Sequence, residues 1–376
     1  MNTVFTESSN IISPLGFSTS ENFNAVTSQS TGITIVEDHS LSPTPIPLSA
    51  IDHTAVAHRF EALNSQKKYT RFEQLAILSI NDALQKSSLS INPQKTLLIL
   101  STTKGNIDLL DKTLKSNFPD ERLNLHTTAK IIGDFFKFAP HPMVVSNACI
   151  SGVAAIVLAQ RLIHQGLYDT VVINGTDILT KFVISGFQSF MSLSAEACKP
   201  FDANRTGLTL GEASATLIIT KTPQPIALID GSTSNDANHI SGPSRTGEGL
   251  LLAINNTLRN NKAPIDFISA HGTATPYNDD MESKAIFRAG LDTVPVNSLK
   301  GYFGHTLGSA GVLETIISIE ALKQNILINT LGCETVGVAE EIAVIQETKH
   351  QELYSLLKLA SGFGGGNAAA LFLKNE

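Results

Sequence analysis

The amino-acid sequence predicts an α/β protein made of two similar halves. Strand-like and helix-like patterns alternate along the chain, and the same alternation starts again after a short polar break near residue 223. The composition fits a globular protein with a large core, because 42% of the 376 residues are hydrophobic and only 16% are charged. Two α/β halves folded against one another would place a functional site at the seam between them.

The charge balance and the termini exclude several functions. The chain has 27 Lys and Arg against 34 Asp and Glu, and this net charge of −7 offers no polybasic surface for nucleic acid or an anionic membrane. No apolar stretch approaches the ~20 residues of a membrane span, and the first residues lack a signal-peptide pattern. We therefore expect a soluble, cytoplasmic protein with no nucleic acid and no membrane among its partners.

The first half contains the clearest alternation. Apolar residues at helical spacing predict an amphipathic helix over 72–84, and a buried strand follows at 96–101. A second strand at 143–145, a helix of small residues at 151–164 and a third strand at 170–173 continue the pattern. This order is typical of an α/β fold.

A polar break at 221–225 separates the halves, and we place the boundary so that they comprise residues 1–222 and 223–376. The first half would carry a cysteine of interest, and the second would carry two histidines and a glycine-rich loop. The second half is predicted to contain strands at 226–229 and 265–269 and helices at 249–260 and 279–289.

Cys149 lies where a predicted strand gives way to the helix of small residues. The helix macrodipole and the unpaired N–H groups there would lower the pKa of a thiol and could also hold an oxyanion. On position alone, a buried structural cysteine explains the pattern equally well. Cys198 and Cys333 lack this context and are predicted to be structural; three scattered cysteines also indicate a reducing compartment.

His271 follows a predicted strand and opens a turn rich in Gly and Thr. Loops at the ends of strands are the usual place for sites in α/β proteins. Taken alone, however, a histidine hydrogen-bonded into the turn is the more common arrangement. Asp279 and Glu282 stand near the start of the next helix, where capping and interaction with the helix dipole explain them.

Lys300 and His305 lie in a loop with several glycines before an apolar helix. Such residues are usually on the surface, but the small residues at 308–311 indicate a tightly packed helix. A second glycine-rich segment, 361–367, follows the strand-like run 355–359 and is typical of a mobile turn. It matches neither phosphate-binding glycine signature, so we expect no nucleotide site.

Taken together and in this order, these segments resemble the β-ketoacyl-acyl-carrier-protein synthases, the condensing enzymes with the thiolase fold. Among these enzymes, the chain resembles the elongating type, which has one catalytic cysteine and two catalytic histidines. It implies a thiolase fold in which the two halves pack as a five-layered αβαβα sandwich. It is weak at 12–16 and strong from residue 146 onward, and it rests on 147–152, 199–207, 211–212, 271–275, 304–305 and 362–365.

The resemblance also implies residue roles. Cys149 would be the nucleophile, and His271, His305 and Lys300 would complete the catalytic set. Backbone N–H groups of Cys149 and Phe363 would form the oxyanion hole, with the Phe363 side chain as a gate. Supporting roles would fall to Thr273, Thr275, Asp279, Glu282 and Glu314.

The implied activity is that of a 3-oxoacyl-acyl-carrier-protein synthase. An acyl group on Cys149 would condense with malonyl carrier protein, with loss of carbon dioxide. The resemblance implies no organic cofactor and no metal, because the substrates arrive on the phosphopantetheine arm of an acyl carrier protein. It further implies a homodimer, or a heterodimer with another synthase-like subunit.

Two alternatives remain open. One is a thiolase-fold acyltransferase or thioesterase that acts on coenzyme A esters, and the other is a subunit that is active only as, or only serves as, a heterodimer partner. Cys149 distinguishes the chain from chain-length-factor relatives that lack the nucleophile. Ser361, Gly366 and the segment 7–10 depart from the family pattern, which favours a specialised polyketide or polyene pathway at least as much as fatty acid synthesis.

Overall fold

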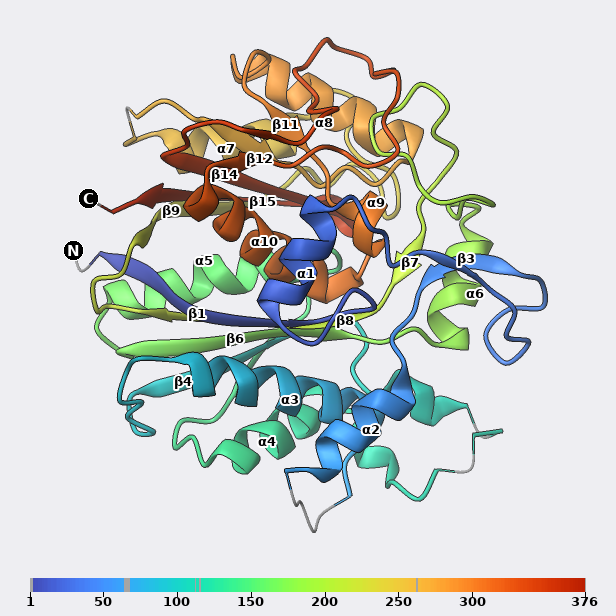
Figure 1. Cartoon of the computed structure of the whole chain (residues 1–376), viewed down its shortest axis with the longest axis vertical. Coiled ribbons are helices and arrows are strands. Elements are labelled where there is room, and N and C mark those ends of the chain that lie inside the picture. The colour runs from blue at the N-terminus through green and yellow to red at the C-terminus, as the bar shows by residue number, and fades with distance from the viewer. Residues whose placement is uncertain (1–2, 64–67, 112, 115, 262, 376) are drawn as a thin grey trace.

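The chain forms five layers, which confirms the predicted αβαβα sandwich (Figure 1). The computed structural model describes residues 3–63, 68–111, 113–114, 116–261 and 263–375. One outer layer contains α3 (Arg71–Lys86) and α4 (Leu125–Phe136), and the other contains α7 (Glu248–Leu258) and α8 (Pro276–Arg288). Between the two sheets lie α5 (Ser151–His164) and α10 (Ala310–Gln324), each packed against strands of both halves.

The two halves repeat one strand topology. The first sheet has the order β5-β4-β6-β8-β1 and the second has the order β11-β10-β14-β15-β9. In each set of five strands, the third strand in chain order, β5 or β11, lies at the outer edge, and the first, β1 or β9, lies at the inner edge. The inner edges join where Val4 to Thr6 pair antiparallel with Leu228 to Ile226. The strands are β1 (Val4–Ile12), β4 (Thr96–Ser101), β5 (Met143–Val145), β6 (Thr170–Asp177), β8 (Ala213–Thr220), β9 (Ile226–Asn235), β10 (Phe267–Ser269), β11 (Val296–Asn297), β14 (Ser355–Gly362) and β15 (Gly366–Lys374).

Shorter elements surround these layers. They are the helices α1 (Thr19–Thr27), α2 (His53–Glu61), α6 (Lys181–Ser189) and α9 (Lys300–Phe303), and the strands β2 (Thr34–Val36), β3 (Ile46–Ser49), β7 (Leu210–Gly211), β12 (Ile326–Leu327) and β13 (Lys349–His350). The strands β2, β3 and β7 form a small separate sheet, and β12 pairs with β13.

Each predicted helix and strand is present, and the differences are at the ends. The strands predicted at 170–173 and 226–229 continue to Asp177 and Asn235. Helix α8 begins at Pro276, three residues before the predicted start, because proline is well suited to the first helical position. The division at residues 222 and 223 falls in the turn between β8 and β9; as a domain boundary it stays a prediction.

Local sequence explains why the outer and central helices differ. Helix α3 starts with a capping box, in which the Thr70 hydroxyl accepts from the Glu73 N–H and the Glu73 carboxylate accepts from the Thr70 N–H. Its apolar face packs on the first sheet. In contrast, α10 is buried on almost all sides because it lies between two sheets. No helix in the described part of the chain has the length and apolar character to cross a membrane.

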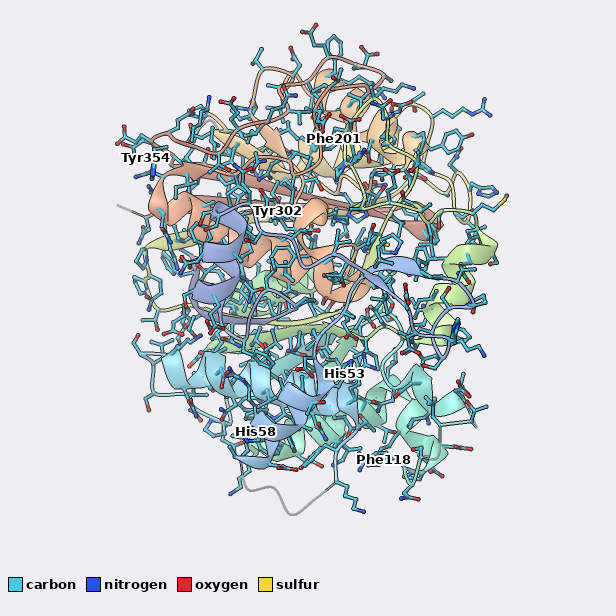
Figure 2. All side chains as sticks on the ribbon, turned by 45° about the vertical axis from the view of Figure 1, so that its right-hand side comes forward. His53, His58, Phe118, Phe201, Tyr302 and Tyr354 are labelled. Carbon is cyan, nitrogen blue, oxygen red and sulfur yellow. The ribbon has the colours of Figure 1, made fainter. Side chains whose placement is uncertain are left out.

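Three apolar clusters fill the spaces between layers. The largest surrounds α5 and α10 between the sheets, and one lies on the outer side of each sheet. Phe201 and Tyr302, two of the largest fully buried side chains, lie inside the upper part of the molecule in Figure 2. The sheets are therefore covered on both faces, as mainly apolar strands require.

The central helices touch at a pair of glycines. A Cβ atom on Gly152 of α5 would lie 2.6 Å from the backbone nitrogen of Val312, and one on Gly311 of α10 would lie 2.6 Å from that of Val153. Neither backbone can give way without moving its helix. The small residues that the sequence placed in both helices are therefore there for close packing.

We expect Gly152→Ala to lower the free energy of unfolding by ~1–3 kcal/mol, because the added methyl group overpacks the contact between α5 and α10. Urea-induced unfolding followed by circular dichroism would measure the change. Gly186→Ala in α6 is the matched control, since a Cβ atom there has no neighbour within 4 Å. Equal stabilities of the two variants would contradict a tight helix contact.

Candidate active site

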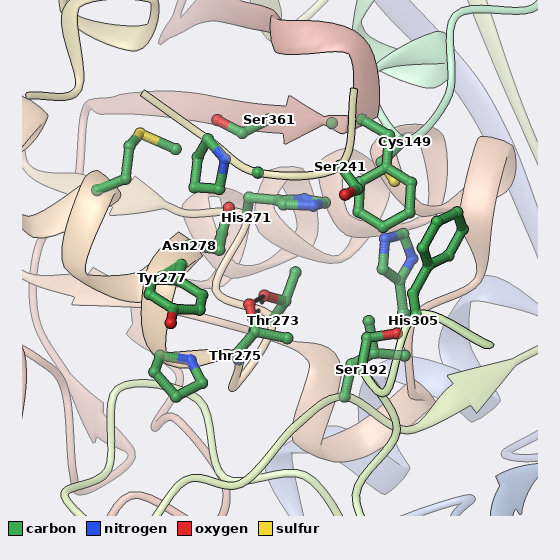
Figure 3. Close-up of a pocket in the computed structure, with 18 of the residues that line it drawn as sticks. Cys149, Ser192, Ser241, His271, Thr273, Thr275, Tyr277, Asn278, His305 and Ser361 are labelled. Atoms are coloured by element: carbon green, nitrogen blue, oxygen red, sulfur yellow. Dashed lines mark hydrogen bonds between the residues drawn. The ribbon is translucent and has the colours of Figure 1, made fainter. Parts of the chain in front are cut away.

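A cavity of about 400 Å³ lies at the seam and is lined by residues of both halves. Cys149, His271 and His305 face the same space within it (Figure 3). The Cys149 Sγ and one ring nitrogen of each histidine all lie within 4.8 Å of one another, and all three residues are buried. The fold therefore brings together three side chains that are far apart in the sequence.

Cys149 sits on a sharp turn between β5 and α5, as predicted. Ala148, just before it, has a φ of 44°, a conformation that residues other than glycine rarely adopt. The Ser151 hydroxyl holds this turn, because it donates to the Ala148 carbonyl at 2.6 Å and accepts from the Asn147 N–H at 2.7 Å. Cys149, held on this turn, lines the cavity.

The electrostatics of Cys149 differ from the expectation. Burial raises the pKa of the Cys149 thiol to about 11, although the positive charge of Lys300 and the backbone N–H of Phe363 act in the opposite direction. The predicted lowering of this pKa by the helix terminus is therefore wrong for this buried thiol. Loss of contact with water outweighs the nearby positive groups.

His305 is fixed by backbone contacts on both sides. Its N–H donates to the Thr209 carbonyl at 2.7 Å, and its carbonyl accepts from the Gly211 N–H at 3.0 Å. Its Nδ1 accepts from the Leu307 N–H at 3.0 Å, so the neutral ring carries its proton on Nε2. Burial, and next the charge of Lys300, hold the pKa of His305 well below the usual 6.5.

His271 follows β10 and meets the ring of His305 edge-on, with ring centroids 5.2 Å apart. The Lys300 ammonium donates to the His271 carbonyl at 2.6 Å and lies 3.3 Å from Nδ1. Nδ1 must therefore accept, which leaves the proton on Nε2. Burial first, and then Lys300, hold the pKa of His271 well below the usual 6.5. Both imidazoles are neutral hydrogen-bond donors.

Asp279 and Glu282 bind backbone N–H groups near the site and do not cap α8, although Asp279 does lie in the first turn of that helix, as the dipole interpretation requires. Glu282 accepts from the N–H groups of His271 and Gly272 at 2.7 and 2.6 Å. Asp279 accepts from the N–H groups of Thr273, at 2.9 Å, and of Phe201 and Ala274. The capping interpretation is wrong for both, because the carboxylates turn back from α8 and hold the loop that carries His271. The N-cap residue of α8 is Thr275.

Lys300 and Glu314 form a buried ion pair at 2.6 Å, and Lys358 of β14 binds the other carboxylate oxygen of Glu314, also at 2.6 Å. The usual surface location for Lys300 and His305 does not apply, since each is only 1% exposed. Sequence reasoning missed Lys358. The available signal was a lysine inside the apolar run 355–359 of a predicted strand.

The glycine-rich segment 361–367 forms the tight connection between β14 and β15 and packs on Cys149. A Cβ atom on Gly362 would lie 3.0 Å from the Cys149 backbone nitrogen. The Phe363 ring lies 5.8 and 5.5 Å from the rings of Phe187 and Phe190, which line the cavity. Phe187 of α6 and the C-cap residue Phe190 were also missed, because nothing in the sequence links this segment to residue 363.

The remaining predicted residues separate into two groups. Thr273 and Thr275 line the cavity with their hydroxyl oxygens 2.8 Å apart. Cys198 and Cys333 are buried elsewhere, and neither lines the cavity.

Within the described residues, Cys149 and the two histidines also form the one group close enough together to hold a metal ion. We assign no metal there, because the Lys300 ammonium beside His271 opposes a divalent cation.

Comparisons with known proteins agree over nearly the whole chain. Residues 10–224 match the model described as "Beta-ketoacyl synthase, N-terminal domain", and residues 226–334 match "Beta-ketoacyl synthase, C-terminal domain". A 3-oxoacyl-acyl-carrier-protein synthase 2 of Coxiella burnetii is 28% identical over 394 residues, which cover 95% of each chain. A putative mitochondrial 3-oxoacyl-acyl-carrier-protein synthase of Schizosaccharomyces pombe is 27% identical over 82% of each chain.

Solved structures give the same picture. A chain from the complex of the ketosynthase ApeO with its chain length factor ApeC, from Xenorhabdus doucetiae, superposes with a TM-score of 0.87 at 26% identity. The superposition covers 100% of this chain and 98% of that one. A β-ketoacyl synthase of Burkholderia phymatum, at 22% identity and a TM-score of 0.86 over 100% of both chains, supports the fold.

We expect Glu282→Gln to flatten the dependence of stability on pH. Burial, and then the charge of Asp279, raise the pKa of Glu282 from 4.5 to about 7. The folded state therefore binds a proton that the unfolded state has released, and the stability due to this group is lost as the pH rises from about 4.5 through about 7. The wild type should lose on the order of 1–3 kcal/mol more than the variant across this range.

Urea-induced unfolding at a series of pH values would test this, with the exposed Glu341→Gln as control. Parallel curves for the wild type and Glu282→Gln would contradict the assignment.

Proposed function

The chain belongs to the beta-ketoacyl synthase family, and we propose that it is a 3-oxoacyl-acyl-carrier-protein synthase that elongates acyl chains by decarboxylative condensation. The observation that carries this proposal is the convergence of Cys149, His271 and His305 around one buried cavity. A nucleophile beside two neutral imidazole donors suits a reaction that needs a covalent intermediate and a stabilised enolate.

Acyl loading is the first step. The Cys149 thiolate attacks the thioester carbon of an acyl chain on a phosphopantetheine arm, and the carrier leaves as its thiol after taking up a proton. The oxyanion of the intermediate would bind the backbone N–H groups of Cys149 and Phe363, which the close approach of Gly362 to Cys149 brings together. Loading yields an acyl-cysteine.

Decarboxylation is the second step. The bond between the carboxylate carbon and the methylene carbon of the malonyl group breaks, and its electron pair passes into the thioester as an enolate. His271 and His305 line the same cavity and each carries its proton on Nε2, so both Nε2–H groups would donate to the enolate oxygen. The positive charge of Lys300 adds to the stabilisation of the negative charge that forms there.

Condensation completes the reaction. The enolate carbon attacks the acyl-cysteine carbonyl, the carbon–sulfur bond to Cys149 breaks, and the product leaves as a 3-oxoacyl carrier protein. Every step uses side chains and backbone groups of this chain, so the proposed reaction needs no cofactor and no metal. Fatty acid synthesis and a specialised polyketide or polyene pathway would both use this chemistry, and three unpaired cysteines suit a reducing cytoplasm.

The edge of the first sheet is a surface for a second subunit. Among the described strands, β5 pairs with β4 alone, so its other edge can accept a further strand, and β5 ends at Val145, shortly before Cys149. The proposed carrier-dependent synthase is therefore expected to be a homodimer. The solved ketosynthase with a chain length factor, at 26% identity, supports a heterodimer as the second candidate.

We expect the purified protein to elute at twice the monomer mass in size-exclusion chromatography with light scattering, and to release carbon dioxide from malonyl carrier protein on its own. A monomer that gains both properties only with a second synthase-like subunit would identify the heterodimer instead.

We expect Cys149→Ala to abolish acyl loading and to retain part of the decarboxylation, because the alanine variant lacks the nucleophile and keeps both imidazole donors. His271→Ala or His305→Ala should lower decarboxylation by ~100-fold or more. Intact-protein mass spectrometry after incubation with acyl carrier proteins of several chain lengths would detect the adduct, and released carbon dioxide would report the second step.

Cys333→Ala is the matched control, because this buried cysteine is outside the cavity. An adduct on the Cys149→Ala protein would contradict the assigned nucleophile, and an adduct from coenzyme A esters alone would favour the coenzyme A-dependent alternative.

A further inference from the structure

Lys358 is a buried lysine in the middle of a central strand. Its neighbours along β14 are apolar or small, and the residue is 0% exposed. A buried ammonium group is tolerated when it has close partners. Lys358 has four: the Nζ donates to Glu314 at 2.6 Å, to the Ser269 carbonyl at 3.2 Å, to the Ser269 hydroxyl at 3.3 Å and to the Ala270 carbonyl at 3.2 Å.

These partners place the Lys358 ammonium group against the two residues that precede His271 in the chain. Ser269 ends β10, Ala270 follows, and His271 comes next. Lys300 donates to the His271 carbonyl at 2.6 Å. Three consecutive carbonyl groups therefore accept from two ammonium groups, which fixes the path of the backbone that carries the imidazole.

Glu314 joins the two lysines. One of its oxygens binds Lys300 and the other binds Lys358, each at 2.6 Å. Although burial alone would raise the pKa of Glu314, the two ammonium groups hold it below its usual value. Without Lys358, Glu314 would have a free oxygen, and the Lys300 ammonium would have a less firmly held partner.

Lys358 also changes the charge next to the site. Lys300 and Glu314 by themselves form a neutral pair, and a second lysine adds a positive charge. Glu282 balances only part of it near neutral pH, because burial raises its pKa to about 7. The titratable groups that face this cluster are Cys149 before α5, Asp279 and Glu282 on α8, Lys300 on α9, His305 and Glu314 at α10, and His271 after β10.

We propose that Lys358 is a positioning residue for decarboxylation: through Glu314, Ser269 and Ala270 it holds Lys300 and the backbone of His271 so that the imidazole presents Nε2–H to the enolate oxygen. The inference rests on the proposed function. It assigns Lys358 mainly to the second step of the reaction, where it acts on both Lys300 and the backbone before His271. The loading step depends on Lys358 only through Lys300, whose charge favours the Cys149 thiolate.

The test compares Lys358→Met with the wild type in the two half-reactions. Methionine is similar in length but has no charge, so decarboxylation should fall by ~10- to 100-fold. Acyl loading measured by mass spectrometry should fall much less, by less than about threefold, because Lys358 acts on Cys149 only indirectly, through Glu314 and Lys300. Lys323→Met on α10 is the matched control, since Lys323 is exposed and pairs with Glu320 at 2.9 Å.

The pH profile separates this role from a general loss of structure. Positive charge near His271 lowers the pKa of this imidazole, so removal of Lys358 should raise it. The acidic limb of the decarboxylation profile should therefore move to higher pH in Lys358→Met. In Lys358→Arg, which keeps the charge but not the compact ammonium group, the limb should stay in place while the rate falls.

A spectroscopic readout does not depend on turnover. Nuclear magnetic resonance of isotope-labelled histidines, with the signal assigned by His271→Ala, should show a neutral ring with Nε2–H in the wild type and protonation at higher pH in Lys358→Met. If Lys358→Met does not fold, Lys358→Arg decides, and a displaced acidic limb in that variant overturns the proposal.

The outcomes are distinguishable. Equal losses in both half-reactions, or a Lys358→Met protein identical to the wild type, overturn the role of Lys358 alone. A wild-type protein that neither loads an acyl group nor releases carbon dioxide overturns the proposed function, and the resonance measurement then still reports whether Lys358 controls His271.

Discussion

The contact between α5 and α10 at Gly152 and Gly311 is the constraint on which the site depends. Helix α5 comes after β5 and helix α10 comes after β11 and the short helix α9. Both begin at the seam, and they touch in their first turns. The segments that lead into them must therefore converge. One segment carries Cys149 and the other carries His305, and their meeting is a consequence of helix packing that any bulkier residue at the contact would disturb. The second strand of the C-terminal half then needs to supply only His271.

Buried charge is the second constraint, and it is distributed in a regular way. Buried carboxylates accept hydrogen bonds from backbone N–H groups, and buried lysines donate hydrogen bonds to backbone carbonyls. Asp177 shows the first arrangement, because it accepts from Gly308 at 2.7 Å and from the Thr103 N–H at 2.9 Å and so ties the two halves together. Buried ions are a weak source of stability, since desolvation offsets their attraction. Their effect here is geometric, because each ion fixes loops that have no regular secondary structure to hold them.

The sequence was sufficient for the elements and for the residues that meet at the cavity, and the reasons are physical. The spacing of apolar residues and the runs of small residues predicted the strands and helices around Cys149. The order of the motifs, through its resemblance to the synthase family, pointed to His271, Lys300 and His305. What it could not supply depends on three-dimensional packing. Lys358 gains its meaning only when β14 lies beside β10, and Asp279 and Glu282 resemble helix caps until the loop folds back on them. The predicted lowering of the pKa of Cys149 was wrong for the same reason. The sequence indicates the helix terminus, but it does not show that the folded chain buries the thiol away from water.

The protonation pattern indicates which step the folded site is built for. In both histidines Nδ1 is occupied by a donor, so Nε2 holds the proton and cannot accept another. Neither ring is arranged to take the proton of Cys149. Loading must instead draw on groups that stabilise the thiolate itself, and two are in place, the positive charge of Lys300 and the N–H of Phe363. The same Lys300 keeps His271 neutral and therefore able to donate. In the proposed reaction, the Lys300 ammonium group thus favours the anion of each step in turn, first the thiolate and then the enolate, and Glu314 holds it in place.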